Sequence, residues 1–423
     1  MHRMHSRSFA DRVRGAFAVF GWRRFGAVLT VAFLIILTTG SKAVASPYFV
    51  SPRGNNTDGR SWQTAWTGLA KIKWSVIGAG DTIYIDGGNK SQVYYDPIVI
   101  AKSGQSSTSV ITVARAIESG RNGQVIIQAT ASSGTGIEIG NNSYISIDGK
   151  GAKGILVQGF STDGVHTGPG SCGVSLSSLE IADGQGNGAH LAGSLISLEA
   201  SVVHDNSCNV LCDQEASPGP SNIIFTNCWI GNRDYTKPYD GIRISSSSVW
   251  SKFLVQGSVL GPCLKNALVY SGIAGALQVT NCLFIDATAS NIKSSASCNL
   301  KQITSFMTAH SPEGFAHACL NVPDSTSVSQ SIFCGGTVVV EPGAKLGQAN
   351  HQSLTAGNTM ALSTFLEKPP FAANVQSYPD EVAAQTLIDT DFSVAPSSPA
   401  TGSGASVTSV KTLLKSIVGT PIP

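Results

Sequence analysis

Polar side chains recur along the chain at intervals that could bring them into one column. Five of seven places separated by 22 to 30 residues are polar, namely Asp183, Asp205, Asn232, Asp286 and His310, and the other two are Pro262 and Gly335. On adjacent turns of a repeat, Asp183 and Asp205 would lie about 5 Å apart. Two such carboxylates could share the acid and nucleophile roles of a retaining glycosidase, or could bind Ca²⁺. The alternative is a structural ladder of turns, which Asp and Asn suit.

Basic residues form a second candidate column in the same part of the chain. Its places hold Ala192, Cys212, Arg243, Val269, Lys293 and Asn321, and Asp240 and Lys265 lie close in sequence. An Arg or Lys can neutralise a sugar carboxylate while the adjacent proton is removed. Arg243 and Lys293 are therefore candidate catalytic residues, and the alternative is ordinary solvated charge. Candidate substrate contacts are Asn232, Asp240, Lys265, Asp286 and His310.

Two ladders of apolar residues indicate which elements position these side chains. The first ladder consists of Leu176, Leu198, Phe225, Val255, Val279, Ile303 and Val328. The second consists of Leu191, Leu211, Ile242, Leu268, Ile292 and Leu320. Both have a period of roughly 25 residues, which is typical of a solenoid. A unit of this length has no room for a crossover helix, so we expect stacked coils of short parallel strands.

Several stretches resemble secreted right-handed parallel β-helix proteins of the pectate-lyase-like superfamily. The N-terminal stretches are YFVSPRGNNTDGRSWQTAWTGLAKI and GAGDTIYIDGG, the central ones are NSYISIDGKG and YDGIRIS, and the last is DTDFSVAPSSPATGSGA. The resemblance covers about residues 47–405. It implies an all-β, right-handed parallel β-helix over residues 46–405. It also implies a polysaccharide partner, with acids that bind Ca²⁺ and an Arg or Lys that removes a proton beside a uronate.

Both ends of the solenoid are expected to carry short capping helices, because uncovered strand edges promote aggregation. The segment 62–77 could form an amphipathic helix over the first coil. Residues 406–418 place apolar side chains at helical spacing, and residues 406–423 are expected to form a second capping helix and a tail.

The cysteines are expected to be mostly buried thiols. All nine lie between Cys172 and Cys334, and an odd number cannot pair completely within one chain. Cys228 and Cys282 stand three residues after first-ladder positions and two coils apart. Two coils span roughly 10 Å, which is too far for a disulfide. The state of Cys208 and Cys212 is left open.

The first 45 residues have the order of a secretory signal. A basic region precedes the apolar stretch 27–37, and an A-x-A site ends at Ala45. These residues hold seven of the 28 Lys and Arg and one of the 26 acids, so the rest carries 21 basic and 25 acidic residues, a net charge of −4. This charge offers no footprint for nucleic acid. We expect a secreted or surface-bound monomer without stable membrane insertion after cleavage.

The sequence favours an exported protein that acts on, or at least binds, a polysaccharide. A lyase that cleaves an acidic glycan is the leading hypothesis, and a glycoside hydrolase is an alternative. A non-catalytic surface or matrix protein that uses its coils for adhesion is the alternative from another class. An acidic cluster facing a basic one would favour an enzyme, whereas a flat face lined by Ser and Thr would favour adhesion.

Overall fold

The computed structural model describes residues 45–130, 134–213, 219–232, 240–248, 251–263, 265–285, 287–306, 318–323, 325–329, 331–334, 337–340 and 351–352. The leader 1–44 and the proposed C-terminal helix at 406–418 lie outside these ranges, and so do Asp286 and His310. Among the described residues, no helix is long and apolar enough to cross a membrane.

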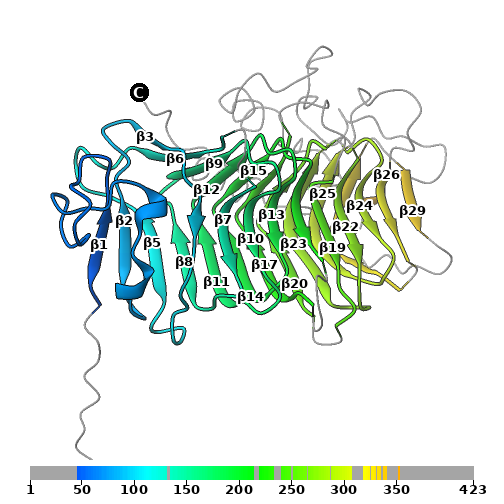
Figure 1. Cartoon of the computed structure of the whole chain (residues 1–423). Coiled ribbons are helices and arrows are strands. Elements are labelled where there is room, and N and C mark those ends of the chain that lie inside the picture. Colours follow the sequence, from blue (N-terminus) through cyan, green and yellow to red (C-terminus); the bar gives the residue numbers. More distant parts are fainter. Residues whose placement is uncertain are drawn as a thin grey trace, which may run out of the picture. The chain divides into compact units, whose positions relative to one another are not determined.

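The described chain forms coils of short strands that stack side by side in parallel along one axis (Figure 1). Each complete coil supplies one strand to each of three faces. The first face contains β1 (Pro47–Val50), β2 (Thr82–Ile85), β5 (Ile111–Arg115), β8 (Ile145–Asp148), β11 (Cys172–Ser177), β14 (Ser194–Glu199), β17 (Ser221–Thr226), β20 (Phe253–Gln256), β23 (Leu277–Ile285), β25 (Asn299–Phe306) and β27 (Ser327–Ser329).

The second face continues the same sheet, because β23 and β25 run through both faces. Its other strands are β3 (Ser91–Tyr94), β6 (Gln124–Gln128), β9 (Ile155–Gln158), β12 (Leu179–Ala182), β15 (Val202–His204), β18 (Trp229–Gly231), β21 (Val259–Leu260), β28 (Ile332–Cys334) and β30 (His351–Gln352). The third face is a separate sheet of β4 (Ile98–Val99), β7 (Thr135–Gly140), β10 (Asp163–Thr167), β13 (Asn187–Leu191), β16 (Cys208–Cys212), β19 (Ile242–Ser245), β22 (Asn266–Ser271), β24 (Ser290–Ser294), β26 (Ala318–Val322) and β29 (Thr337–Val340).

The first apolar ladder is confirmed as far as Val279. Leu176 pairs with Leu198, Leu198 with Phe225, Phe225 with Val255, and Val255 with Val279. All five side chains point inward and are fully buried. Burial of an aliphatic or aromatic side chain stabilises a fold by roughly 1.5–3 kcal/mol, so the stacked ladder forms a continuous hydrophobic core.

The ladder continues through Leu300, so the prediction of Ile303 is wrong by three residues. Val279 pairs with Leu300, and Leu300 pairs with Val328. Ile303 instead pairs with Cys282. The error arises because the coil from Val279 to Leu300 is shorter than its predecessors, and both residues are apolar and buried.

A sharp corner joins the first and second faces in successive coils. One corner residue has a left-handed backbone, with φ of 46° at Ala200, 57° at Asn227 and 52° at Asn281. The next residue is small, and its side chain donates to the carbonyl oxygen two residues earlier, at 2.7 Å from Ser201 and 3.4 Å from Cys228. Small residues are therefore required here by the tight backbone turn.

The cysteine prediction is confirmed. Cys228 and Cys282 occupy this corner column on coils separated by the Ser258 coil, and both are fully buried. All eight cysteines whose side chains are described are free, including Cys208 and Cys212. Burial raises the pKa of the Cys228 and Cys282 thiols to about 12, which keeps them protonated and unreactive.

The prediction of a capping helix at 62–77 is wrong. This segment contains only two 3-10 turns, η2 (Leu69–Lys71) and η3 (Trp74–Val76). Trp66 instead adds extended backbone to the open edge of β1, because Ser51 N–H donates to Trp66 O and Trp66 N–H donates to Phe49 O. Its indole is fully buried and stacks on Tyr48 with ring centroids 5.4 Å apart. An inserted aromatic side chain therefore covers the first coil.

Replacing Trp66 by Ala should lower the free energy of unfolding by about 3–5 kcal/mol, because it opens a cavity beside Tyr48 and removes the aromatic cover of the first coil. Trp66→Phe should cost clearly less, since the buried indole nitrogen has no hydrogen-bond partner among the described residues. Urea denaturation of both variants measures the difference. Equal midpoints for Trp66→Ala and the unmodified protein would show that Trp66 is not the cap.

Candidate functional site

One row of outward-facing side chains runs along the third face from coil to coil. Strand pairing places the following residues in register: Val99, Glu138, His166, His190, Leu211, Arg243, Val269, Lys293 and Asn321. We call this row the third-face column. The strands that carry it, from β4 to β26, follow one another along the solenoid (Figure 1). Neighbouring members are therefore about 4.8 Å apart along the axis.

The N-terminal half of the third-face column pairs imidazoles with carboxylates. Nδ1 of His166 lies 2.7 Å from Oε1 of Glu138. Nε2 of His190 lies 2.7 Å from Oδ1 of Asp213, and its Nδ1 lies 3.7 Å from Oδ2 of Asp163. The two imidazole rings are 5.3 Å apart between centroids. Two ionisable rings thus lie on adjacent coils, each oriented by carboxylates.

His190 is expected to carry a positive charge at neutral pH. Partial burial lowers the pKa of His190, but hydrogen bonds to Asp163 and Asp213 and their negative charges outweigh this effect and raise it to about 9. Asn187 Nδ2 also donates to Asp163 Oδ1 at 2.8 Å, which fixes the buried carboxylate beneath the ring. His190 can therefore act as a proton donor near neutral pH.

The C-terminal half of the column carries cations separated by apolar residues. Arg243 Nε donates to Oδ2 of the buried Asp240 at 2.9 Å, and Asn266 Nδ2 donates to Asp240 Oδ1 at 2.7 Å. Burial opposes the Arg243 charge, but Asp240 outweighs it, so the pKa of Arg243 is raised. The Arg243 side chain is 41% exposed, and Lys293, two coils further on, is exposed. Both cations are accessible to a ligand.

A short motif places four charged members of the column. Glycine, an apolar residue and a charged residue follow one another at 136–138, 164–166, 188–190 and 241–243. The apolar residue points into the core, so the next residue points outward. Glycine is needed because the coils approach closely: a Cβ on Gly164 would lie 2.5 Å from the carbonyl oxygen of Gly188.

The predicted basic column is correct from Arg243 onward and wrong before it. Arg243, Val269, Lys293 and Asn321 are in register as expected. Ala192 and Cys212 are not members, because His190 and Leu211 occupy those places. The error hid Glu138, His166 and His190. The 24-residue interval between the two histidines, each inside the glycine motif, could have revealed them.

The predicted acidic column lies at the corner that follows the second face. Ala182 pairs with His204, so Asp183 and Asp205 are on adjacent coils as expected. Both have a left-handed φ of 57°. Asn232 accepts from Asp205 N–H and occupies the next place. Asp183 is exposed, whereas Asp205 is 5% exposed and directs Oδ2 to His204.

The remaining predicted site residues are placed as follows. Asp240 lies beneath Arg243 on the third face, and Lys265 is an exposed residue just before β22. Asp286 and His310 lie outside the described residues. The catalytic and binding roles assigned from sequence stay predictions.

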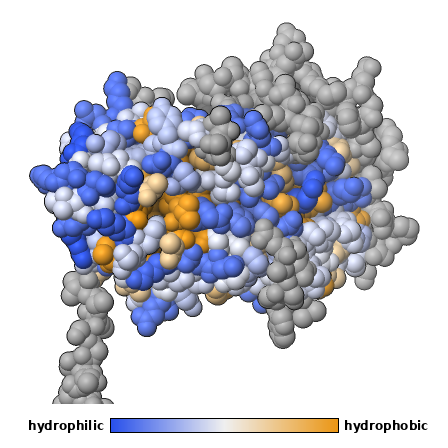
Figure 2. All heavy atoms as spheres, in the orientation of Figure 1, coloured by the Kyte–Doolittle hydropathy of each residue, from blue (hydrophilic) through white to orange (hydrophobic). Residues whose placement is uncertain are grey.

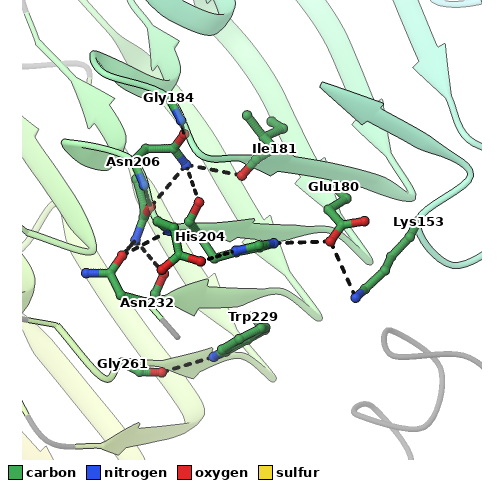
Figure 3. Close-up of polar contacts among 12 residues, drawn as sticks. Lys153, Glu180, Ile181, Gly184, His204, Asn206, Trp229, Asn232 and Gly261 are labelled. Carbon is green, nitrogen blue, oxygen red and sulfur yellow. Dashed lines mark hydrogen bonds and ion pairs between the residues drawn. The ribbon is translucent and has the colours of Figure 1, made fainter. Parts of the chain in front are cut away.

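A buried ionic network joins three coils beside this corner (Figure 3). His204 Nδ1 lies 2.7 Å from Asp205 Oδ2, and its Nε2 lies 3.1 Å from Glu180 Oε1, which is 3.6 Å from Lys153 Nζ. Because both ring nitrogens face carboxylates, both must donate, and His204 is an imidazolium. The Trp229 ring stacks on it at 5.8 Å. We call these four ionisable residues the His204 network.

The His204 network uses its acids internally. His204 is 2% exposed. Burial lowers the pKa of His204, but the two carboxylates raise it more, and the net pKa is raised. Burial raises the pKa of Glu180, but the hydrogen bond from His204 and the charge of Lys153 lower it more. The network therefore stabilises the corner rather than presenting charge to a ligand.

The residues present do not fit the Ca²⁺ site expected at Asp183 and Asp205. Asp205 directs an oxygen to His204, whereas Ca²⁺ prefers six to eight converging oxygens. Within the described ranges, no group of three or more His, Cys, Asp or Glu side chains is placed to hold a metal ion.

Replacing His204 by Gln should lower the free energy of unfolding by about 3–5 kcal/mol, because it removes the imidazolium that Asp205 and Glu180 share inside the protein. His166→Gln, on the more exposed third face, is the matched control and should cost less than about 1 kcal/mol. Chemical denaturation at several pH values measures both. Similar losses in the two variants would contradict the structural role of the His204 network.

The stability that His204 contributes should depend on pH. Its folded pKa is raised, so its contribution is complete below the unfolded value of 6.5 and is lost as pH rises through the folded pKa. The folded pKa of Glu180 is lowered, so its contribution is present above 4.5 and is lost in stronger acid. His204→Gln should flatten the alkaline decline, and an unchanged decline would exclude His204 as its cause.

Comparisons with known proteins concern the fold alone at these identities. No family model matches the sequence, and no curated protein matches it. The pectate lyase Pel9A superposes with a TM-score of 0.52 and 15% identity over 76% of this chain and 82% of that chain. A rhamnogalacturonan lyase superposes with a TM-score of 0.43 and 12% identity over 76% of this chain and 90% of that chain. An alginate lyase from Paenibacillus sp. superposes with a TM-score of 0.41 and 13% identity over 67% of this chain and 97% of that chain. The chain therefore shares the parallel β-helix fold of Pel9A.

Proposed function

We propose that this protein binds an acidic polysaccharide along the third-face column and cleaves it by β-elimination, as a polysaccharide lyase. The observation that carries the proposal is the register of His166, His190 and Arg243 on one exposed strand face. The fold shared with the pectate lyase Pel9A supports the same reaction class by analogy. Export directed by residues 1–45 would bring the protein to extracellular glycans.

The reaction needs three functions that the column can supply. A base takes the proton from the carbon beside the uronate carboxylate, a cation neutralises that carboxylate, and an acid protonates the departing glycosidic oxygen. The electrons of the broken C–H bond form the new C=C bond, and the C–O bond to the leaving sugar breaks. The products are one unsaturated chain end and one ordinary chain end.

The geometry favours a particular division of these roles. Glu138 orients the His166 ring through Nδ1, and His166 is assigned as the base. His190, with its pKa raised to about 9, is the proton donor one coil away, and it would exchange its longer contact, Nδ1 to Asp163 Oδ2 at 3.7 Å, for a hydrogen bond to the glycosidic oxygen. Arg243 holds its guanidinium on Asp240 with two of its five donors and can bind a carboxylate with the others.

The surface around the column suits a sugar chain. Figure 2 shows a mainly hydrophilic surface with an apolar cluster over the early coils. Val99, 52% exposed, begins the third-face column beside Glu138. Apolar contacts of this kind can accept the C–H faces of sugar rings, while charged groups fix their orientation.

The test is a panel of acidic and neutral polysaccharides, each with and without Ca²⁺, followed by the ultraviolet absorbance of unsaturated ends and by reducing ends. His166→Ala, His190→Gln and Arg243→Ala should each lower kcat on the cleaved polymer by about 10²-fold or more. Lys301→Ala, an exposed change on the first face, is the control. Wild-type turnover in all three third-face variants would contradict this site, and reducing ends without unsaturation would indicate a glycoside hydrolase.

The sequence-based assignment of Asp183 and Asp205 can be tested in the same assay. Asp183→Asn should leave turnover within about twofold of wild type if chemistry occurs at His166 and His190. Asp205→Asn should act mainly on stability, because Asp205 is bonded to the buried His204. A fall of about 10²-fold in kcat for folded Asp183→Asn would show that the active site lies at the corner that carries Asp183, and not on the third face.

The pH dependence of cleavage should identify the proton donor. Because His190 donates only in its protonated form, kcat should fall as pH rises through about 9. His190→Gln should remove this alkaline limb from its residual activity. A limb that persists unchanged in the variant would assign the proton donor to another group.

Non-catalytic glycan binding is a second candidate, favoured by the first face. Thr82, Thr112, Ser146, Ser175 and Ser197 are in register and form a row of hydroxyl side chains on successive coils. If no polymer in the panel is cleaved, retardation in native affinity gels decides whether any glycan is bound.

A further inference from the structure

The cations of the third-face column are separated by a constant spacing. Arg243 pairs with Val269, which pairs with Lys293, so the two cations are two coils apart. His190 pairs with Leu211, which pairs with Arg243, so the same spacing separates these two residues. The column thus alternates a cation with an apolar residue over five successive coils.

The alternation fixes the distance between successive cations along the solenoid axis. Parallel strands lie 4.7–4.9 Å apart, so two coils span about 10 Å. An extended, linear 1,4-linked glycan lengthens by close to one coil spacing with each sugar, so two coils correspond to a disaccharide. Successive cations of the column would therefore meet every second sugar of a chain lying along the axis.

We infer that the third-face column selects a glycan that displays one carboxylate per disaccharide toward the protein. Arg243 and Lys293 would bind successive carboxylates of this repeat, and Val269 would contact the sugar between them. A polymer with alternating uronate and neutral sugars has this chemistry, and so does a two-fold polyuronate whose alternate carboxylates face away. This inference rests on the proposed function, because it assumes an acidic glycan on the third face.

The apolar positions contribute to this selectivity. A carboxylate held against Val269 would lose water without gaining a hydrogen-bond donor from that side chain, which is unfavourable. A carboxylate placed on Val269 weakens binding, and a carboxylate placed on Arg243 or Lys293 strengthens it. Both effects increase the difference in affinity between two ligands. Total charge alone would not produce such a difference, because long-range attraction depends little on the arrangement of charges.

Two octasaccharides of equal charge test the inference by titration calorimetry with the folded His166→Ala variant, which prevents turnover. One carries four uronates at alternate sugars, and the other carries four consecutive uronates. The alternating chain should bind about tenfold more tightly, corresponding to about one additional charge-assisted hydrogen bond. Arg243→Ala and Lys293→Ala should each remove most of this preference, whereas Lys301→Ala should not. An octasaccharide made only of uronates, in a two-fold conformation, distinguishes the two kinds of glycan. Its affinity should equal that of the alternating chain only if every second carboxylate faces away from the protein.

A cation placed between the two native ones gives the reciprocal test. Val269→Lys should reverse or abolish the preference, and Val269→Gln, which adds no charge, should not reverse it. Equal binding of the two equal-charge octasaccharides by the starting protein would overturn the inference even if wild-type protein cleaves acidic glycans. Absence of both binding and cleavage for every acidic glycan would overturn the proposed function together with it.

Discussion

Parallel pairing between successive coils is the constraint on which the other features depend. It fixes neighbouring strands about 4.8 Å apart and places equivalent residues of each coil in one row. The left-handed corners at Ala200, Asn227 and Asn281 maintain this register although coil length varies. Inside the solenoid the rows form an apolar core, and outside it they form columns of functional groups. An outward-facing side chain can therefore be substituted without disturbing the inward-facing side chains of the core.

The apolar pattern of the sequence predicted most of the first face and much less of the third. Leu198, Phe225 and Val255 are large inward residues at similar intervals, and their register was predicted correctly. The third-face register failed where the inward residue is the small Ala189 and where an apolar residue, Leu211, points outward. Apolar character alone cannot distinguish the two sides of a strand in such coils.

Short-range rules also failed at the first coil. The segment containing Trp66 has enough apolar residues for an amphipathic helix, but an open strand edge and the face of Tyr48 compete for it. Tertiary contacts decided the outcome, because β1 has backbone groups that only extended chain can satisfy. The resemblance of the sequence to parallel β-helix proteins predicted the strand but not how its edge is covered.

Two ionic clusters with similar residue types have different physical roles because their exposure differs. The His204 network is closed on itself, with His204 2% exposed and both carboxylates bonded within the protein. The third-face column leaves Arg243 41% exposed on a surface that a long ligand could follow. Counting charged residues in the sequence could not separate these roles, since burial depends on the side of the strand and on the corner geometry.

The most direct measurement is a crystal structure of the folded His166→Ala variant with an acidic octasaccharide that wild-type protein cleaves. The glycan is expected to lie along the solenoid axis on the third face, with one carboxylate on Arg243 and a scissile bond beside residue 166 and His190. A glycan bound on the first face, or across the coils at the Asp183 corner, would contradict the assignment of the third-face column as the active site.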